Sequence, residues 1–210
     1  MSICSEDDHF ILETFVNLFK LRTIAWNVYG ASDDLLDQSP YFMPQIRNPL
    51  SYGSLNERVK FLDDDVKQRF AHLVRKSSLF ELRPIDFDQM SYKNNWSKPF
   101  LLWCRLSPIY RKSICAKDGV TVVTMLSDCM IFHAVRLVFE HFGRVKEFGG
   151  VASLNHSVWF HSFDPNGWFL YETKCTRITN TSAIVEGRMF DEDGKCVISA
   201  LQEGYINSKI

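Results

Sequence analysis

The sequence lacks any block of like charge. Its 24 Lys and Arg residues are balanced by 25 Asp and Glu residues, and the two signs are interspersed along the chain. Non-specific binding to a nucleic acid or an anionic membrane surface depends on clustered positive charge. We therefore expect neither a nucleic acid nor a membrane as a partner.

Long apolar runs are also missing. A charged residue interrupts each run before it reaches the roughly eighteen residues that a membrane-spanning helix needs. The N-terminus carries Glu6, Asp7 and Asp8, where a secretory signal would carry positive charge. We expect a soluble protein that is not exported.

Metal-ligand spacings are absent as well. The six cysteines form no C-x-x-C pair, and we expect reduced thiols that fill small spaces in the core (Cys4, Cys104, Cys115, Cys129, Cys175 and Cys196). We interpret His133, His156 and His161 as structural residues, because His156 and His161 would point to opposite faces of a strand. No metal and no cofactor is expected.

What the sequence does contain divides into three regions. With 46% apolar residues, the chain can bury one sizeable core. Residues 1–37 hold an amphipathic stretch that predicts a short helix. Residues 38–78 combine three prolines with a charged stretch and predict a linker. Residues 79–210 carry the strongest pattern and predict the folded domain.

The third region predicts an α+β fold. Its expected elements are strands at 80–87 and 99–106, a helix at 121–142, and strands at 153–163, 168–178, 183–190 and 195–206. An Asp-Gly pair at 193–194 predicts a hairpin between the last two strands. Because the helix is apolar on nearly all sides, it needs cover on most of them. We therefore predict an antiparallel sheet wrapped around a long central helix.

Three polar residues stand in apolar surroundings. Asp128 lies inside the apolar helix, where a buried carboxylate is costly unless hydrogen bonds or charges satisfy it. It is therefore a candidate functional group, although partial exposure or a loop-capping role explains it equally well. Ser153 and Gln202 lie in apolar strands, where such residues more commonly bond to the backbone.

Several linked motifs resemble, in order and spacing, the C-terminal hotdog domain of the type II (TesB-like) acyl-CoA thioesterases. They are Glu-Leu-Arg-Pro-Ile-Asp-Phe (81–87), Leu-Ser-Asp-Cys-Met-Ile-Phe (126–132), Ser-Leu-Asn-His-Ser-Val-Trp-Phe-His (153–161), Trp-Phe-Leu-Tyr-Glu (168–172), Glu-Gly-Arg-Met-Phe-Asp-Glu-Asp-Gly (186–194) and Ser-Ala-Leu-Gln-Glu-Gly (199–204). Linked motifs are far more specific than one short pattern. The resemblance implies a single hotdog fold and hydrolysis of fatty acyl-CoA thioesters.

The resemblance also implies the catalytic residues. The family's aspartate, its threonine or serine, and its glutamine fall on Asp128, Ser153 and Gln202. In the family these side chains hold a water that attacks the thioester carbonyl, with the aspartate accepting the proton. Ser153 keeps the hydroxyl of the more common threonine and lacks its methyl group, so we expect it to be tolerated.

The family's first hotdog domain has no counterpart here. Family members carry two hotdog folds, but residues 1–37 match none of the motifs of the first. We therefore expect this chain to form a homodimer or to pair with another hotdog protein. The alternative is a weakly active acyl-CoA-binding or partner subunit. Enoyl-CoA hydration fits less well, because His133 follows Asp128 by five residues and leaves the helix face.

The last three residues suggest a location. Ser208, Lys209 and Ile210 are similar to the peroxisomal address Ser-Lys-Leu, with one aliphatic residue exchanged for another. We expect recognition by a peroxisomal import receptor and a peroxisomal location, and otherwise a cytoplasmic one.

Overall fold

A computed structural model describes residues 25–29, 45–62, 64, 67–68, 71, 79–93, 98–111, 116–161 and 164–209. The side chains of residues 25–29, 111, 116 and 117 are outside this description. The helix expected near the N-terminus, Cys4, Cys115 and Ile210 also lie outside the described residues.

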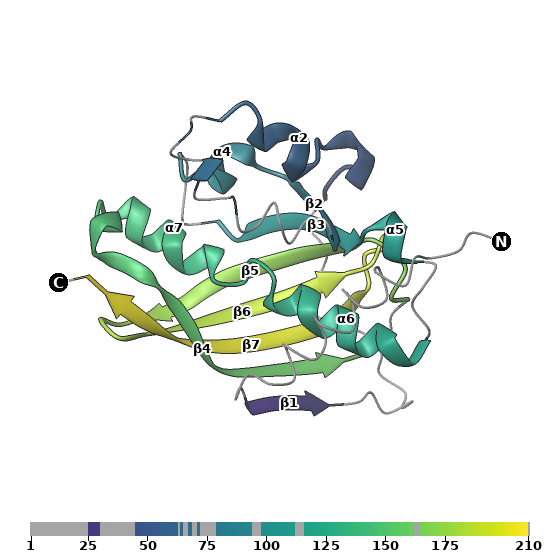
Figure 1. The fold of residues 1–210 in the computed structure, drawn as a ribbon. Coiled ribbons are helices and arrows are strands. Elements are labelled where there is room, and N and C mark those ends of the chain that lie inside the picture. Colours follow the sequence, from purple (N-terminus) through teal and green to yellow (C-terminus); the bar gives the residue numbers. More distant parts are fainter. Residues whose placement is uncertain are drawn as a thin grey trace.

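The described strands form one seven-stranded sheet in the order β1-β4-β7-β6-β5-β3-β2 (Figure 1). They are β1 (Ala25–Tyr29), β2 (Phe80–Pro84), β3 (Phe100–Leu106), β4 (Phe148–Phe160), β5 (Phe169–Ile178), β6 (Ser182–Phe190) and β7 (Cys196–Ser208). Every neighbouring pair among β2 to β7 is antiparallel. Gly194, with φ of 85°, lies in the turn between β6 and β7, where the hairpin was predicted.

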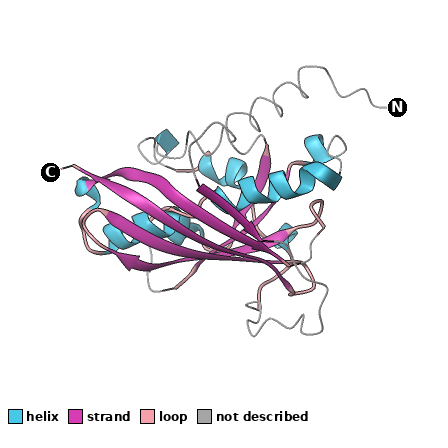
Figure 2. Cartoon of the chain, turned by 90° about the horizontal axis from the view of Figure 1, so that it is seen from below, coloured by secondary structure: helices cyan, strands magenta, loops and turns pink. Residues whose placement is uncertain are grey.

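Alternation of burial explains how the sheet faces the core. Along β6, buried residues alternate with half-buried ones, so that Ala183, Val185 and Met189 point inward. Register shifts interrupt the pairing between Ser153 and Asn155 in β4 and between Cys175 and Arg177 in β5. Such irregularities bend strands and increase their twist. The strands accordingly twist along the length of the sheet (Figure 2).

The central helix consists of two pieces rather than one. The prediction of an unbroken helix over 121–142 was wrong, because α6 (Ala116–Asp128) ends before α7 (His133–His141) begins. Met130 has φ of 69°, in the left-handed region, and this interrupts the helix between α6 and α7. The stretch 118–141 is long and apolar enough to cross a membrane by composition alone, but it is mostly buried in this fold, like a core helix.

Strand β1 was not predicted. It pairs in parallel with β4, from Ala25 beside Asn155 to Tyr29 beside Trp159, and lies at the end of the sheet (Figure 1). A strand at the edge of a sheet presents unpaired backbone groups to any strand that approaches. Strand β1 therefore covers an edge of β4 that would otherwise be open.

Part of the predicted linker packs into the core. The short elements of the fold are η1 (Pro49–Ser51), α2 (Leu55–Val59), α4 (Phe87–Met90), α5 (Pro108–Arg111) and η2 (Val145–Glu147). Helix α2 begins with a capping box in which Ser54 and Glu57 bond to each other's backbone amides. Leu55, Val59 and Leu62 belong to the main core cluster. The domain boundaries themselves stay predictions.

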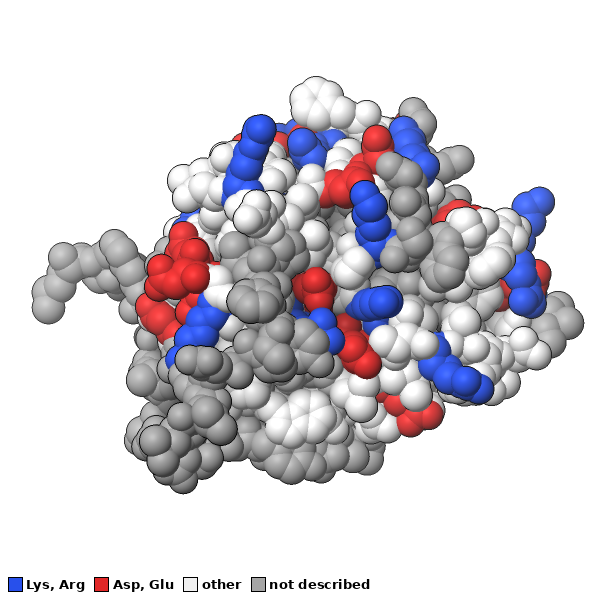
Figure 3. All heavy atoms as spheres, turned by 180° about the vertical axis from the view of Figure 1, so that it is seen from behind, with Lys and Arg blue, Asp and Glu red and all other residues white. Residues whose placement is uncertain are grey.

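A second, smaller apolar cluster lies apart from the main core and contains Trp103, Trp168, Leu170, Phe190 and Cys196. The guanidinium of Arg105 covers the ring of Trp168 at 4.1 Å, and Glu81 binds Arg105 at 2.7 Å. Basic and acidic side chains lie side by side elsewhere too, as Figure 3 shows for the face seen from behind.

Candidate active site

The structure brings together the three side chains that the sequence singled out. Asp128 is the last residue of α6, Ser153 lies in β4, and Gln202 lies in β7. The Gln202 side-chain amide donates to Asp128 Oδ1 at 2.8 Å and to Ser153 Oγ at 2.7 Å. Residues 49 and 74 positions apart in the chain therefore share one hydrogen-bonded cluster.

Gln202 is fully buried, and its environment fixes its orientation. A carboxylate can only accept hydrogen bonds, so the NH₂ end of the amide faces Asp128. Both N–H groups are used by Asp128 and Ser153. The remaining oxygen, Oε1, is buried and accepts no hydrogen bond from the residues that the structure describes. Because leaving such an acceptor empty is costly, the position suits a small polar molecule.

The other two members retain hydrogen-bonding capacity. Ser153 Oγ accepts from Gln202, so its own proton is available for donation. Asp128 and Ser153 are only partly buried, in contrast to Gln202. The cluster therefore has one fully buried anchor and two members that a substrate or water can reach.

His156 lies directly opposite Gln202 in the β4–β7 pairing. Its Nε2 is 3.3 Å from Ser127 Oγ, and that hydroxyl donates to the backbone carbonyl of Thr124 at 2.8 Å. Burial lowers the pKa of His156 to about 4, although the nearby Asp128 carboxylate acts in the opposite direction. His156 is therefore neutral near pH 7 and ties helix α6 to the sheet without adding charge.

The other two histidines lie in different surroundings. The buried His133 has Nδ1 at 3.0 Å from Tyr92 Oη, and its ring contacts that of Phe100. His161 is exposed and bonds to Ser199 Oγ. Within the described part of the chain, no three His, Cys, Asp or Glu residues lie close enough together to hold a metal ion.

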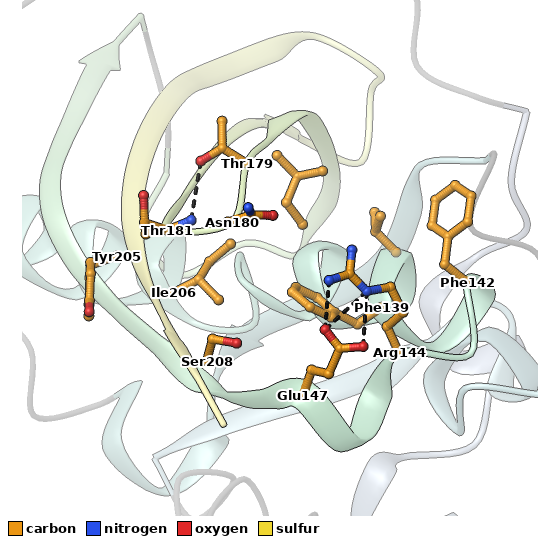
Figure 4. Close-up of a pocket in the computed structure, with 12 residues that line it drawn as sticks. Phe139, Phe142, Arg144, Glu147, Thr179, Asn180, Thr181, Tyr205, Ile206 and Ser208 are labelled. Carbon is orange, nitrogen blue, oxygen red and sulfur yellow. Dashed lines mark hydrogen bonds and ion pairs between the residues drawn. The ribbon is translucent and has the colours of Figure 1, made fainter. Parts of the chain in front are cut away.

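A cavity of about 750 Å³ opens at the far end of helix α7 (Figure 4). Its apolar lining comes from Val138, Phe139, Phe142, Ile178 and Ile206. Thr179, Asn180, Thr181 and the Arg144–Glu147 ion pair add polar groups to the same lining, as Figure 4 shows.

The cavity and the cluster share strand β7. Ile206 follows Gln202 by four residues, which corresponds to about 13 Å along a strand. Both side chains are buried and point to the same face. Gly204 lies between them, and the ring of Phe132 packs so closely on Gly204 that an added Cβ would lie 2.7 Å from it.

Solved structures share this fold. The chain superimposes on an acyl-CoA thioesterase II from Mycobacterium marinum with a TM-score of 0.58 and 17% identity, covering 85% of this chain and 60% of that one. A hotdog-fold protein from Alicyclobacillus acidocaldarius gives a TM-score of 0.53 and 13% identity, with the same coverage of 85% and 60%. The predicted α+β hotdog fold is therefore confirmed.

Curated relatives match over a shorter stretch. The chain is 38% identical over 60 residues to acyl-coenzyme A thioesterase 8 of Rattus norvegicus, covering 28% of this chain and 19% of that protein. It is 35% identical over 57 residues to acyl-CoA thioesterase 2 of Haemophilus influenzae, covering 27% and 20%. The match thus spans about a fifth of the length of these relatives.

A family model for the acyl-CoA thioesterase C-terminal domain matches residues 57–206. The match begins within helix α2 and ends near the end of β7, so it includes all three members of the hydrogen-bonded cluster. Because the match covers most of the chain, the protein belongs to the family of acyl-CoA thioesterase C-terminal domains.

Proposed function

We propose that this protein hydrolyses fatty acyl-CoA thioesters to a free fatty acid and CoA, with Asp128, Ser153 and Gln202 as the catalytic residues. The observation that carries the proposal is the double hydrogen bond from the Gln202 amide to Asp128 and Ser153. The unused Gln202 Oε1 beside these bonds offers an acceptor for a water molecule.

The chemistry follows from what each group can donate or accept. Asp128 accepts a proton from the bound water, whose oxygen then attacks the thioester carbonyl carbon. Gln202 and Ser153 hold the water and the carboxylate in a reactive geometry, which lowers the entropic cost of bringing the water to the thioester. When the tetrahedral intermediate collapses, the C–S bond breaks and the sulfur takes the proton from Asp128.

A fatty acyl chain fits the surroundings of the cluster. The apolar cavity lies about 13 Å from Gln202 along the buried face of β7. An alkyl chain gains about 0.8 kcal/mol for each methylene that it buries. We propose that the acyl chain extends from the thioester carbonyl at the cluster toward this cavity, and that the Phe132 ring, which packs on Gly204 between the two, moves aside to admit it.

Release of free thiol from acyl-CoA esters of increasing chain length tests the proposal. The 210-residue chain should release CoA, and Asp128→Asn should lower kcat by at least about 100-fold because the amide cannot accept the proton. Glu203→Gln is a suitable control, because Glu203 neighbours Gln202 in sequence but bonds to Asn155. Folded protein that releases no thiol from any acyl-CoA would contradict the proposal.

A binding subunit without turnover is not favoured. All three polar side chains are present and joined by hydrogen bonds. Hydration of an enoyl-CoA is not favoured either, because the ring of His133 is engaged with Tyr92 and Phe100.

Pairing with a second hotdog domain is part of the proposal. Parallel strand β1 occupies the edge of β4, so a second domain that pairs at this edge has to displace β1. We propose a homodimer or a complex with another hotdog protein. Light scattering coupled to gel filtration measures the mass of the full chain, and a monomer that hydrolyses acyl-CoA would contradict this part.

The peroxisomal location also stays a proposal. Ser208 ends strand β7, and the backbone amide of Lys209 donates to the carbonyl of Glu147. An import receptor that reads the C-terminal residues therefore has to release Ser208 from strand β7 and Lys209 from its bond to Glu147. Microscopy of a fluorescent fusion with and without Lys209→Glu tests the location, and an unchanged distribution would contradict it.

A further inference from the structure

The end of helix α6 is fixed by a side chain from outside the three-residue cluster. Tyr171 of β5 donates its hydroxyl proton to the backbone carbonyl of Ser127, with an oxygen–oxygen distance of 2.5 Å. This carbonyl belongs to the peptide group that joins Ser127 to Asp128. The bond therefore acts on the peptide plane from which the Asp128 side chain projects.

The position of the bond follows from the break in the central helix. Helix α6 ends at Asp128, and Met130, two residues later, has a left-handed backbone that is incompatible with a continued helix. The last carbonyls of a helix lack the amides of a following turn. Ser127 is fully buried, so its carbonyl needs another donor. Tyr171, which is 1% exposed, supplies that donor from the sheet.

Tyr171 remains a donor at all ordinary pH values. Burial raises the pKa of its hydroxyl well above the usual value, and the nearby Cys104 and Asp128 add to the increase. A neutral hydroxyl in this position can orient Asp128 without competing with it for a proton.

A glycine makes room for the tyrosine. A Cβ atom at Gly187 of β6 would lie 2.7 Å from Tyr171 Oη and 2.8 Å from its Cε2. Glycine weakens the interior of a strand, and it often marks a place where another group approaches closely. Here the approaching group is the phenol ring on its path to the Ser127 carbonyl.

We propose that Tyr171 is a positioning residue for thioester hydrolysis, and that Gly187 is required for its position. Tyr171 holds the Ser127–Asp128 peptide so that Asp128 Oδ1 stays at hydrogen-bonding distance from the Gln202 amide. A displacement of about 1 Å at a catalytic group can lower the rate by roughly a hundredfold. This role rests on the hydrolysis proposed above.

Tyr171→Phe removes only the hydroxyl group and tests the role directly. We expect kcat to fall about tenfold, because one buried carbonyl loses its donor. KM should stay within about twofold, because Tyr171 is buried and acts on the backbone behind Asp128. Tyr110→Phe is the matched control, since Tyr110 is also buried but lies in α5, and it should leave kcat and KM unchanged.

Gly187→Ala separates positioning from general packing. If the added methyl group acts by moving Tyr171, its effect on kcat disappears once the hydroxyl is gone. The double variant Gly187→Ala with Tyr171→Phe should therefore have about the same kcat as Tyr171→Phe alone. If the double variant lowered kcat by the product of the two single-variant factors, the proposed coupling between Gly187 and the Tyr171 hydroxyl would be contradicted.

Amide hydrogen exchange provides a readout that does not depend on activity. In the full chain, Tyr171→Phe should accelerate exchange in the peptide that spans 125–132, whereas Tyr110→Phe should not. If the wild type hydrolysed no thioester, the proposed function would fail. Hydrogen exchange would still test whether Tyr171 holds the Ser127–Asp128 peptide in place. Wild-type exchange at 125–132 in Tyr171→Phe would overturn the positioning role.

Discussion

Two polar clusters, each with a buried glutamine, flank the break in the central helix, and they differ in how their hydrogen-bonding groups are used. We call them the acidic cluster (Asp128, Ser153 and Gln202) and the histidine cluster (Gln89, Tyr92 and His133). Each contains a buried glutamine, and each lies among apolar side chains. Composition therefore does not distinguish a structural cluster from a candidate active site in this protein.

The difference lies in how completely the hydrogen bonds are used. In the histidine cluster, His133 Nδ1 lies 3.0 Å from Tyr92 Oη and Nε2 lies 3.4 Å from the carbonyl of Gln89. In the acidic cluster, Gln202 Oε1 has no partner among the residues that the structure describes. A buried acceptor that the protein leaves unused beside a reachable carboxylate indicates a place for a bound molecule.

The largest expected difference between the two clusters is in the effect on kcat of replacing their glutamines with alanine. Gln202→Ala removes the donor to Asp128 and Ser153, and we expect kcat for acyl-CoA hydrolysis to fall by about 10² to 10³. Gln89→Ala removes a side chain that bonds to the carbonyl of Lys98. It should lower the melting temperature and leave kcat within about twofold.

Steady-state kinetics and thermal unfolding of both variants make this comparison. Equal losses of kcat in Gln202→Ala and Gln89→Ala would mean that both clusters serve only the fold. A loss confined to Gln202→Ala would support the assignment of the acidic cluster to chemistry.

A smaller effect is expected at the wall between the acidic cluster and the cavity. In Gly204→Ala, the added Cβ would clash with Val151 Cγ1 and would meet the Phe132 ring at 2.7 Å. We expect a destabilisation of about 1–3 kcal/mol, because the ring has to move. Gly167→Ala is the control, since its nearest neighbour would be the Asp164 carbonyl at 3.5 Å. Equal unfolding midpoints in urea would contradict the close packing of Phe132.

Acid should destabilise the folded protein through a buried histidine at each of the two clusters. Burial lowers the pKa of His156, beside the acidic cluster, to about 4 and that of His133 to about 3. Below the usual histidine pKa of about 6.5, the unfolded chain binds protons that the folded protein excludes. Stability is therefore fully present above pH 6.5 and is lost as the pH falls toward 4.

Urea unfolding at pH 7 and pH 5 measures this loss. Each histidine contributes at most roughly 2 kcal/mol between these two pH values. His133→Asn and His156→Asn should each reduce the difference, whereas His161→Asn, at an exposed position, should not. If the wild type were equally stable at both pH values, the conclusion that His133 and His156 are buried in the neutral form would be contradicted.

Much of the fold could be predicted from the sequence. Strands β4 to β7 alternate or run apolar between turn residues, and the Asp-Gly at 193–194 marks their last hairpin. Because the central helix is apolar on nearly all sides, it had to be covered on most of them, and the sheet provides this cover. Asp128 stands out in the sequence as a charge in an apolar helix, and the linked motifs group it with Ser153 and Gln202, to which it is joined in the structure.

The rest depended on tertiary contacts that leave no local pattern. Methionine does not favour a left-handed backbone, so nothing at Met130 predicted the break between α6 and α7. The close approach of Tyr171 to Gly187 joins two strands and a helix end. Pairing of β1 with β4 is parallel and spans more than a hundred residues, so no hairpin signal accompanies it.

A single turnover in H₂¹⁸O tests direct attack by water most directly. With enzyme in excess over acyl-CoA, the account predicts one ¹⁸O atom in the released carboxylate and an unchanged intact mass of the protein at all quench times. An acylated Ser153 trapped by the quench, or ¹⁸O incorporated into the Asp128 carboxylate, would contradict it.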